Sequence, residues 1–220
     1  MTQIAWLVLA TAIASAVVDW IAVVREHLRL RWIFKPGTIL LLALVTLALQ
    51  PTSNPQRYLF VAALLLSLLG DVFLLMSDRH FRAGLIAFLT AHLAYCLGFL
   101  VAGANRGLLT IAVPAVAVVS LAIGGRILRA LADHPPPGVW RAGRGGAAYP
   151  VTAYLLAISA MLTLAAASGK SAALIGAMLF YVSDGLIAWN RFVRPLAWSQ
   201  LPVIVTYHLG QVGLVLSLAT

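Results

Sequence analysis

Two acidic side chains stand inside stretches of the sequence that are otherwise almost entirely apolar. Asp71 lies in LLGDVFLLM, residues 68–76, and Asp184 lies in LFYVSDGLIAW, residues 179–189. An ionisable side chain in hydrocarbon costs roughly 2.5–3.5 kcal/mol on insertion scales, so each one needs a partner, water or a function. A buried carboxyl that keeps its proton can act as a general acid, and an ionised neighbour can stabilise a cation. The two residues therefore predict acid–base chemistry in an apolar surrounding.

Further polar groups recur at helical spacing. Phe88, His92 and Tyr95 are spaced i, i+4 and i+7, which places them on one face of a helix. A histidine at this position can hydrogen-bond one acid or shuttle its proton, and tyrosine or glutamine side chains can position water. Such a face must point inward, because lipid penalises it. The remaining candidates for contact with a ligand are Lys35, Ser183, Tyr207, His208 and Gln211.

Each of these residues also has a structural interpretation. A buried aspartate beside Lys35 can be an ion pair that fixes helix packing. Asp19 is close enough to the membrane surface for water or Arg25 to satisfy it, and His92 and His208 can be hydrogen-bonded core residues. Two histidines and two aspartates have the right chemistry for zinc, but the sequence contains no HxxxH or CxxC pair. No metal site is predicted.

The elements that would carry these residues are membrane-spanning helices. Of the 220 residues, 62% are hydrophobic and 10% are charged, which is more apolar than a water-soluble globule. Apolar runs long enough to cross ~30 Å of hydrocarbon define the expected spans. The second span is short, has Lys35 at its entrance, and needs residues near Trp32 to cross. We predict an all-α bundle of eight transmembrane helices in a single domain, 1–220. The spans are 4–24, 36–50, 58–77, 82–103, 107–128, 148–168, 171–190 and 199–219.

The distribution of basic residues predicts the orientation of the bundle. When alternate loops are assigned to opposite sides, only Arg57, Arg106 and Lys170 fall on one side, and the other 12 of the 15 Lys and Arg residues fall opposite. The positive-inside rule then places both termini on the non-cytoplasmic side. The net charge of +9 needs no nucleic-acid partner to explain it. The one long connection, 131–147, contains HPPPG and is expected to be a cytoplasmic loop.

The ionisable residues are expected at similar depths in the bundle. Counted from the cytoplasmic ends of the predicted spans, Asp19, Asp71 and Asp184 lie about 7–9 Å inside. The two span histidines and Tyr207 lie about 12–15 Å inside. Groups from five helices in the cytoplasmic half predict one shared polar pocket that opens to that side.

Five motifs, in this order, resemble the lysoplasmalogenase (YhhN-like) family over nearly the whole chain. The order and spacing of the motifs make the resemblance specific. It implies an eight-helix membrane hydrolase that cleaves the vinyl ether of lysoplasmalogens, releasing a fatty aldehyde and a glycerophospho-headgroup product. The motifs are WIFKP at 32–36, LLGDVFL at 68–74, FxxxHxxY at 88–95, LFYVSDGLIAWNRF at 179–192 and YHLGQ at 207–211.

The implied reaction suits the buried acids. An enol ether hydrolyses when its outer vinyl carbon is protonated, and this step requires a general acid that retains its proton at neutral pH. A second, ionised carboxylate can stabilise the resulting cation and orient water, as in glycosidases. Asp71, Asp184 and His92 are the catalytic candidates, with the roles of the two acids open. No cofactor is required, the partners are the lysophospholipid and the bilayer, and the expected location is the bacterial cytoplasmic membrane.

Two other functions fit some of the same residues. Carboxylates and histidines on inward faces also form proton relays, so a proton-coupled transporter is one alternative. Recognisable inverted repeats and paired broken helices, which many transporters contain, are absent from the sequence. A metal-dependent lipid amidase is the other alternative, and bound zinc would identify it.

Overall fold

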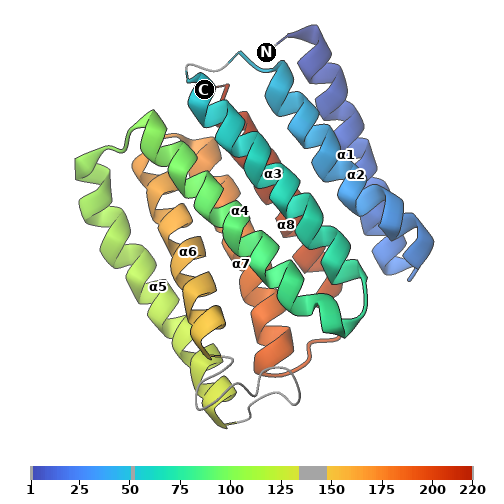
Figure 1. The fold of residues 1–220 in the computed structure, drawn as a ribbon, viewed down its shortest axis with the longest axis vertical. Helices are drawn as coiled ribbons and strands as arrows, with labels where there is room; N and C mark the ends of the chain where they lie inside the picture. Colours follow the sequence, from blue (N-terminus) through green and yellow to red (C-terminus); the bar gives the residue numbers. More distant parts are fainter. Residues whose placement is uncertain (1, 51–52, 134–147, 220) are drawn as a thin grey trace.

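The computed structural model describes residues 2–50, 53–133 and 148–219, and these residues form helices and no strands (Figure 1). A helix satisfies every backbone polar group within its own segment, which hydrocarbon requires. The short 3-10 helix η1, Asp78–His80, precedes α4. The main helices are α1 (Gln3–Val24), α2 (Leu28–Ala48), α3 (Asn54–Leu75), α4 (Phe81–Ala102), α5 (Arg106–Asp133), α6 (Ala148–Ala167), α7 (Ser171–Phe192) and α8 (Gln200–Leu216).

The helices have the length and surface of membrane spans. Within the described residues, α1 to α7 are long and apolar enough to cross a bilayer, whereas α8 is apolar and has 17 residues. Large hydrophobic side chains face outward, such as Leu7 at 70% exposure and Leu121 at 76%. Such a surface suits lipid and not water. The chain is an integral membrane protein, and the predicted all-α class is confirmed.

The helices are arranged as two outer pairs around four central helices. Figure 1 shows α1 and α2 along one edge and α5 and α6 along the opposite edge, with α3, α4, α7 and α8 between them. Some helices that are not consecutive in the chain also pack together. Helix α4 packs against α6, and α8 packs against α1 and α2 as well as α7. Both ends of the chain lie at the same end of the bundle (Figure 1). The central helices carry most of the predicted site residues.

Several helix boundaries differ from the prediction. Helix α2 begins at Leu28 and not at residue 36, with Pro36 inside it. Lys35 therefore lies within the helix and is buried, so its predicted place at the entrance is wrong. Helix α5 continues to Asp133, five residues beyond its predicted end. The predicted cytoplasmic loop falls mainly on 134–147, which lie outside the described residues.

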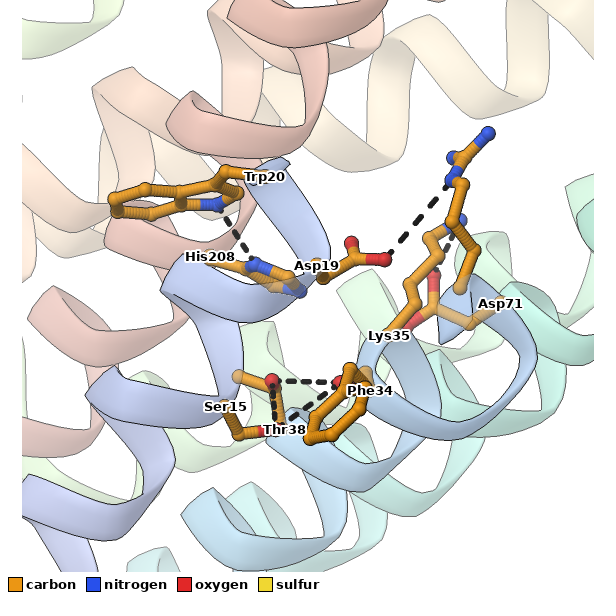
Figure 2. Close-up of polar contacts among 9 residues, drawn as sticks. Ser15, Asp19, Trp20, Phe34, Lys35, Thr38, Asp71 and His208 are labelled. Carbon is orange, nitrogen blue, oxygen red and sulfur yellow. Dashed lines mark hydrogen bonds and ion pairs between the residues drawn. The ribbon is translucent and has the colours of Figure 1, made fainter. Parts of the chain in front are cut away.

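Polar side chains join α1 to α2 around Pro36. The Thr38 hydroxyl donates to the Phe34 carbonyl at 2.7 Å and also contacts Ser15 Oγ of α1 at 2.9 Å (Figure 2). The Ser15 hydroxyl reaches the same carbonyl at 3.3 Å. Hydroxyl groups of this kind provide donors to backbone carbonyls near a proline in a membrane helix. These contacts hold α2 against α1 in the turn of α2 that contains Lys35.

Candidate active site

The first of two polar clusters forms around Asp71 of α3. Its side chain is fully buried, and Lys35 Nζ of α2 lies 3.1 Å from Asp71 Oδ1. The Tyr207 hydroxyl of α8 donates to the other carboxylate oxygen at 2.7 Å. Deeper in the bundle the Tyr95 hydroxyl of α4 donates to Gln211 Oε1 of α8 at 2.6 Å. Three helices thus meet at one carboxylate, which has an ammonium group and a tyrosine hydroxyl as its partners.

A third acid, Asp19 of α1, lies next to this cluster. Its carboxylate is fully buried and 3.9 Å from Arg31 Nε, one helical turn before Lys35 (Figure 2). Both carboxylate oxygens of Asp19 lack a hydrogen-bond partner among the described residues. On the other side of Asp19, Trp20 Nε1 donates to His208 Nδ1 at 3.1 Å (Figure 2). The partner of Asp19 is therefore Arg31, and the predicted contact with Arg25 is not found in the described part of the chain.

The second cluster forms around Asp184 of α7. The Tyr154 hydroxyl of α6 donates to Asp184 Oδ2, and His92 Nε2 of α4 lies 3.5 Å from the same oxygen. The rings of His92 and Tyr154 pack edge to face, with centroids 5.2 Å apart. Neither nitrogen of His92 makes a hydrogen bond within the described residues. Asp184 therefore has a tyrosine hydroxyl and an imidazole beside it, and no described lysine or arginine forms an ion pair with it.

Aromatic rings separate the two clusters. Phe180 of α7 contacts His92 at 4.8 Å between centroids and Tyr207 at 5.4 Å. Phe88 of α4 packs edge to face on Tyr207 at 5.8 Å. Each acid has its own hydrogen-bond partners, and the single polar pocket that we predicted is instead two adjacent clusters. Side chains on the same inward faces fill the space between them.

An apolar cavity lies on the Asp184 side of these rings. It has a volume of about 50 Å³ and is bounded by α4, α5, α6 and α7 with one residue of α3. Phe88 lines it, as do Phe81 and Phe192 at the helix ends near the α3–α4 and α7–α8 connections. Among the described residues that line it, Asp184 alone is charged. The cavity thus places one carboxyl against a surface suited to an alkyl chain.

The remaining candidates divide between the clusters and the packing core. The Ser183 hydroxyl donates to the Val203 carbonyl at 2.9 Å, and this hydrogen bond joins α7 to α8. Tyr154 and Arg31 were not among the site residues predicted from the sequence. For Tyr154, a tyrosine hydroxyl near the end of a predicted span was a visible signal. Within the described residues, no three His, Cys, Asp or Glu side chains gather closely enough to hold a metal ion.

The fold and these contacts define a polytopic helical membrane protein with buried acid–base groups beside an apolar cavity. The chain belongs to the YhhN family, whose sequence profile matches residues 30–218. This confirms the resemblance drawn from the five motifs. No solved structure matches the chain.

Curated relatives include proteins from animals and bacteria. Lysoplasmalogenase TMEM86B of Homo sapiens is 34% identical over 165 residues, which cover 75% of this chain and 65% of the human protein. The same protein of Mus musculus is 32% identical over 185 residues, 84% of this chain and 74% of the mouse protein. Lysoplasmalogenase of Mycobacterium tuberculosis (strain CDC 1551 / Oshkosh) is 31% identical over 198 residues, 84% of this chain and 69% of that protein. The chain spans just under two thirds of the length of the human relative.

Proposed function

We propose that this protein is a membrane-embedded lysoplasmalogenase that hydrolyses the vinyl ether bond of a lysophospholipid. The observation that carries the proposal is a pair of buried carboxyl groups, Asp71 and Asp184, on either side of aromatic residues that border an apolar cavity. Membership of the YhhN family supports it, as do the relatives named lysoplasmalogenase. A single-chain lipid needs an apolar space for its tail and polar groups for its glycerol and head, and the two clusters provide both.

The orientation of the protein follows from its charges. We place all eight helices across a bacterial cytoplasmic membrane, with both termini outside and the ends of α1, α3 and α7 that carry the acids on the cytoplasmic side. At about 1.5 Å per residue, α8 reaches roughly 26 Å, which is near the lower limit for a span. Its place against α7 supports a full crossing. The lipid would enter from the inner leaflet.

The two acids are suited to different steps. Protonation occurs at the outer vinyl carbon, on the tail side of the bond, and Asp184 faces the cavity where the tail would lie. We assign Asp184 the proton donation, with Tyr154 and His92 holding its carboxyl in place. We assign Asp71, which pairs with the Lys35 ammonium, the role of the ionised carboxylate, which stabilises the oxocarbenium ion from the glycerol side and orients water. Binding in this position requires Phe88 to rotate, since its ring lies between the cavity and Tyr207.

The steps that follow protonation need no further catalytic residue. Water adds to the carbon bonded to the ether oxygen and gives up a proton, which forms a hemiacetal. The bond between that carbon and the glycerol oxygen then breaks. The hemiacetal hydroxyl loses its proton to become the aldehyde carbonyl, and the glycerol oxygen takes up a proton, so the products are a fatty aldehyde and the glycerophospho-headgroup compound. The proton from water restores the acid, so the catalytic groups end in their starting protonation states.

The decisive experiment measures aldehyde release by purified protein in lipid nanodiscs. The substrate is an alkenyl lysophosphoethanolamine, and a 1-acyl lysophosphoethanolamine serves as the comparison substrate. In D₂O the aldehyde, trapped at once by reduction, should carry one deuterium on the carbon next to the carbonyl carbon, because the proton is delivered to carbon. Absence of aldehyde from the wild-type protein would overturn the proposed function.

Two variants test the acids. Asp71→Asn and Asp184→Asn should each lower kcat by at least about a hundredfold, the usual contribution of a general acid or base. Asp133→Asn, an exposed change far from both clusters, is the matched control and should retain activity. Thermal unfolding must show that the variants are folded. Wild-type kcat in a folded Asp184→Asn or Asp71→Asn protein would remove that residue from the mechanism.

A further inference from the structure

A second and larger hollow lies at the other side of the bundle from the apolar cavity. It has a volume of about 490 Å³ and opens between the α1–α2 turn and the α7–α8 connection. Its lining shares no residue with the apolar cavity and contains side chains of both charges. The residues that matter for its chemistry are Glu26, Leu28, Arg31, Trp198, Gln200 and Leu201. We call this hollow the headgroup cleft, for the reasons that follow.

One part of the headgroup cleft is suited to an anion. Helix α2 begins at Leu28 and helix α8 begins at Gln200, so two helix N-termini with their partial positive charges meet in its lining. Neither N-terminus has a side-chain cap. Arg31 adds a full positive charge, and only its Nε is directed at Asp19, at 3.9 Å. Its two terminal nitrogens make no hydrogen bond to the described residues, so they remain free for a phosphate.

The other part of the headgroup cleft is suited to a cation. Glu26 sits in the α1–α2 turn with φ at 52°, the only non-glycine residue with positive φ among the described residues. Its carboxylate makes no ion pair within the described part of the chain, although basic residues stand on either side of it in the sequence. Trp198 is 63% exposed at the same cleft. A carboxylate binds an ammonium group by charge-assisted hydrogen bonds, and an indole ring attracts it through a cation–π interaction.

We propose that the headgroup cleft binds the phospho-amine headgroup of a lysolipid, with the phosphate at Arg31 and the ammonium at Glu26 and Trp198. The proposal rests on the proposed function and adds the position and chemistry of headgroup recognition. Arg31 and Lys35 are one turn apart on α2, about 6 Å along the axis. The few covalent bonds between the phosphorus and the ether oxygen span a similar length. A phosphate at Arg31 therefore brings the ether oxygen close to Asp71, which Lys35 contacts.

The test measures binding of lipids that cannot react, so it does not depend on turnover. The probes are three saturated alkyl ethers with the same chain: a lysophosphoethanolamine, a lysophosphatidic acid without the amine, and an alkyl glycerol without the phosphate. Arg31→Gln should weaken binding of both phosphate-containing probes on the order of tenfold and leave the alkyl glycerol unchanged. Glu26→Gln should weaken only the amine-containing probe, by about threefold, because the site is exposed.

Matched controls change the same charges outside the cleft. Arg29→Gln lies two residues from Arg31, is exposed, and does not line the cleft, and Asp133→Asn removes an exposed acid elsewhere. Both should bind all three probes as the wild type does. Arg31→Gln also leaves the buried Asp19 without its cation, so Glu26→Gln, at an exposed position, carries the test if the Arg31 variant does not fold.

The outcomes separate this proposal from the proposed function. The cation half would be overturned if Glu26→Gln bound the lysophosphoethanolamine probe as tightly as the wild type does, and if the wild type bound that probe no more tightly than the lysophosphatidic acid probe. Unchanged binding of both phosphate probes in folded Arg31→Gln would overturn the anion half. If the wild type shows the expected probe pattern but releases no aldehyde from an alkenyl lysolipid, the hydrolase proposal fails and the cleft stands as a lysolipid headgroup site. In turnover assays the cleft variants should raise KM with little change in kcat.

Discussion

The Tyr154 hydroxyl and the His92 imidazole approach one oxygen of Asp184 from two different helices. The hydroxyl donates a hydrogen bond, and the imidazole nitrogen lies 3.5 Å away. Because the other surroundings of this carboxyl are mostly apolar, these two groups determine its direction and its ability to exchange a proton. A positioning role for Tyr154 follows from this geometry.

Tyr154→Phe tests that role at the level of one atom. The variant keeps the ring that packs on His92 and removes only the hydroxyl. We expect kcat to fall about tenfold to a hundredfold, since a hydrogen bond to a charged or reacting carboxyl is worth roughly 1.5–3 kcal/mol. KM should change little, because the substrate does not need this hydroxyl to bind. Aldehyde release over a range of substrate concentrations measures both constants.

A matched tyrosine provides the control. Tyr149→Phe removes a hydroxyl from the same helix at a position that is 76% exposed, and it should leave kcat unchanged. If both variants have wild-type kcat, Tyr154 has no part in positioning Asp184. If Tyr154→Phe raises KM and keeps kcat, the hydroxyl contacts the substrate and not the acid.

At the residue scale the sequence predicted both acids and, as one interpretation, the ion pair of Asp71 with Lys35. It did not predict Tyr154 or which of the acids His92 contacts. Asp71 and Asp184 were predictable because a charge inside an apolar run is visible without any structure. Their partners depend on which helices are neighbours and on the rotation of each helix about its axis. Lys35 contacts Asp71 from inside α2, which begins at Leu28. The basic residues of the first turn of α2 obscured that start in the sequence.

Helices α7 and α8 approach each other closely enough for their backbones to be in contact. A Cβ added to Gly176 would lie 2.6 Å from the Leu214 backbone nitrogen and 2.8 Å from the Gly210 carbonyl oxygen. Backbone atoms cannot move aside as a side chain can, so only glycine allows the two helices to pack at this distance. This packing places Asp184 of α7 and Tyr207 of α8 at fixed positions on either side of Phe180.

Gly176→Ala should therefore separate α7 from α8. We expect a fall of several degrees in the thermal unfolding midpoint in detergent, together with a loss of activity, because overpacking a tight contact costs typically 1–3 kcal/mol. Gly125→Ala in α5 is the matched control, since an added Cβ there meets nothing within 4 Å. That change should be neutral or stabilise by up to about 1 kcal/mol, the helix preference for alanine. Equal midpoints for the two variants would contradict the role of Gly176.

For the whole molecule, hydropathy predicted the number and order of the helices, but not the contacts between helices that are not consecutive in the chain. Eight apolar runs and the position of most loops follow from the length needed to cross a bilayer. The placement of α6 between α4 and α5, and of α8 against α1 and α2, depends on side-chain packing that has no simple signature in one sequence. For the same reason the sequence predicted a single polar pocket, whereas Phe88 and Phe180 divide the space into two clusters.

The orientation in the membrane determines which leaflet the buried acids face, and it can be tested on the whole chain. Both chain ends lie at one end of the bundle (Figure 1), as an even number of crossings requires. Basic residues concentrate in the connections at the opposite end, so the chain ends should be outside the cytoplasm.

In Escherichia coli, alkaline phosphatase fused after Thr220 should be active, and green fluorescent protein at the same site should be dark. Fusions after Asp133 should show the reverse. Fluorescence at Thr220 with inactive phosphatase would place the acids and the headgroup cleft at the outer leaflet, and the lysolipid would then have to come from outside the cell.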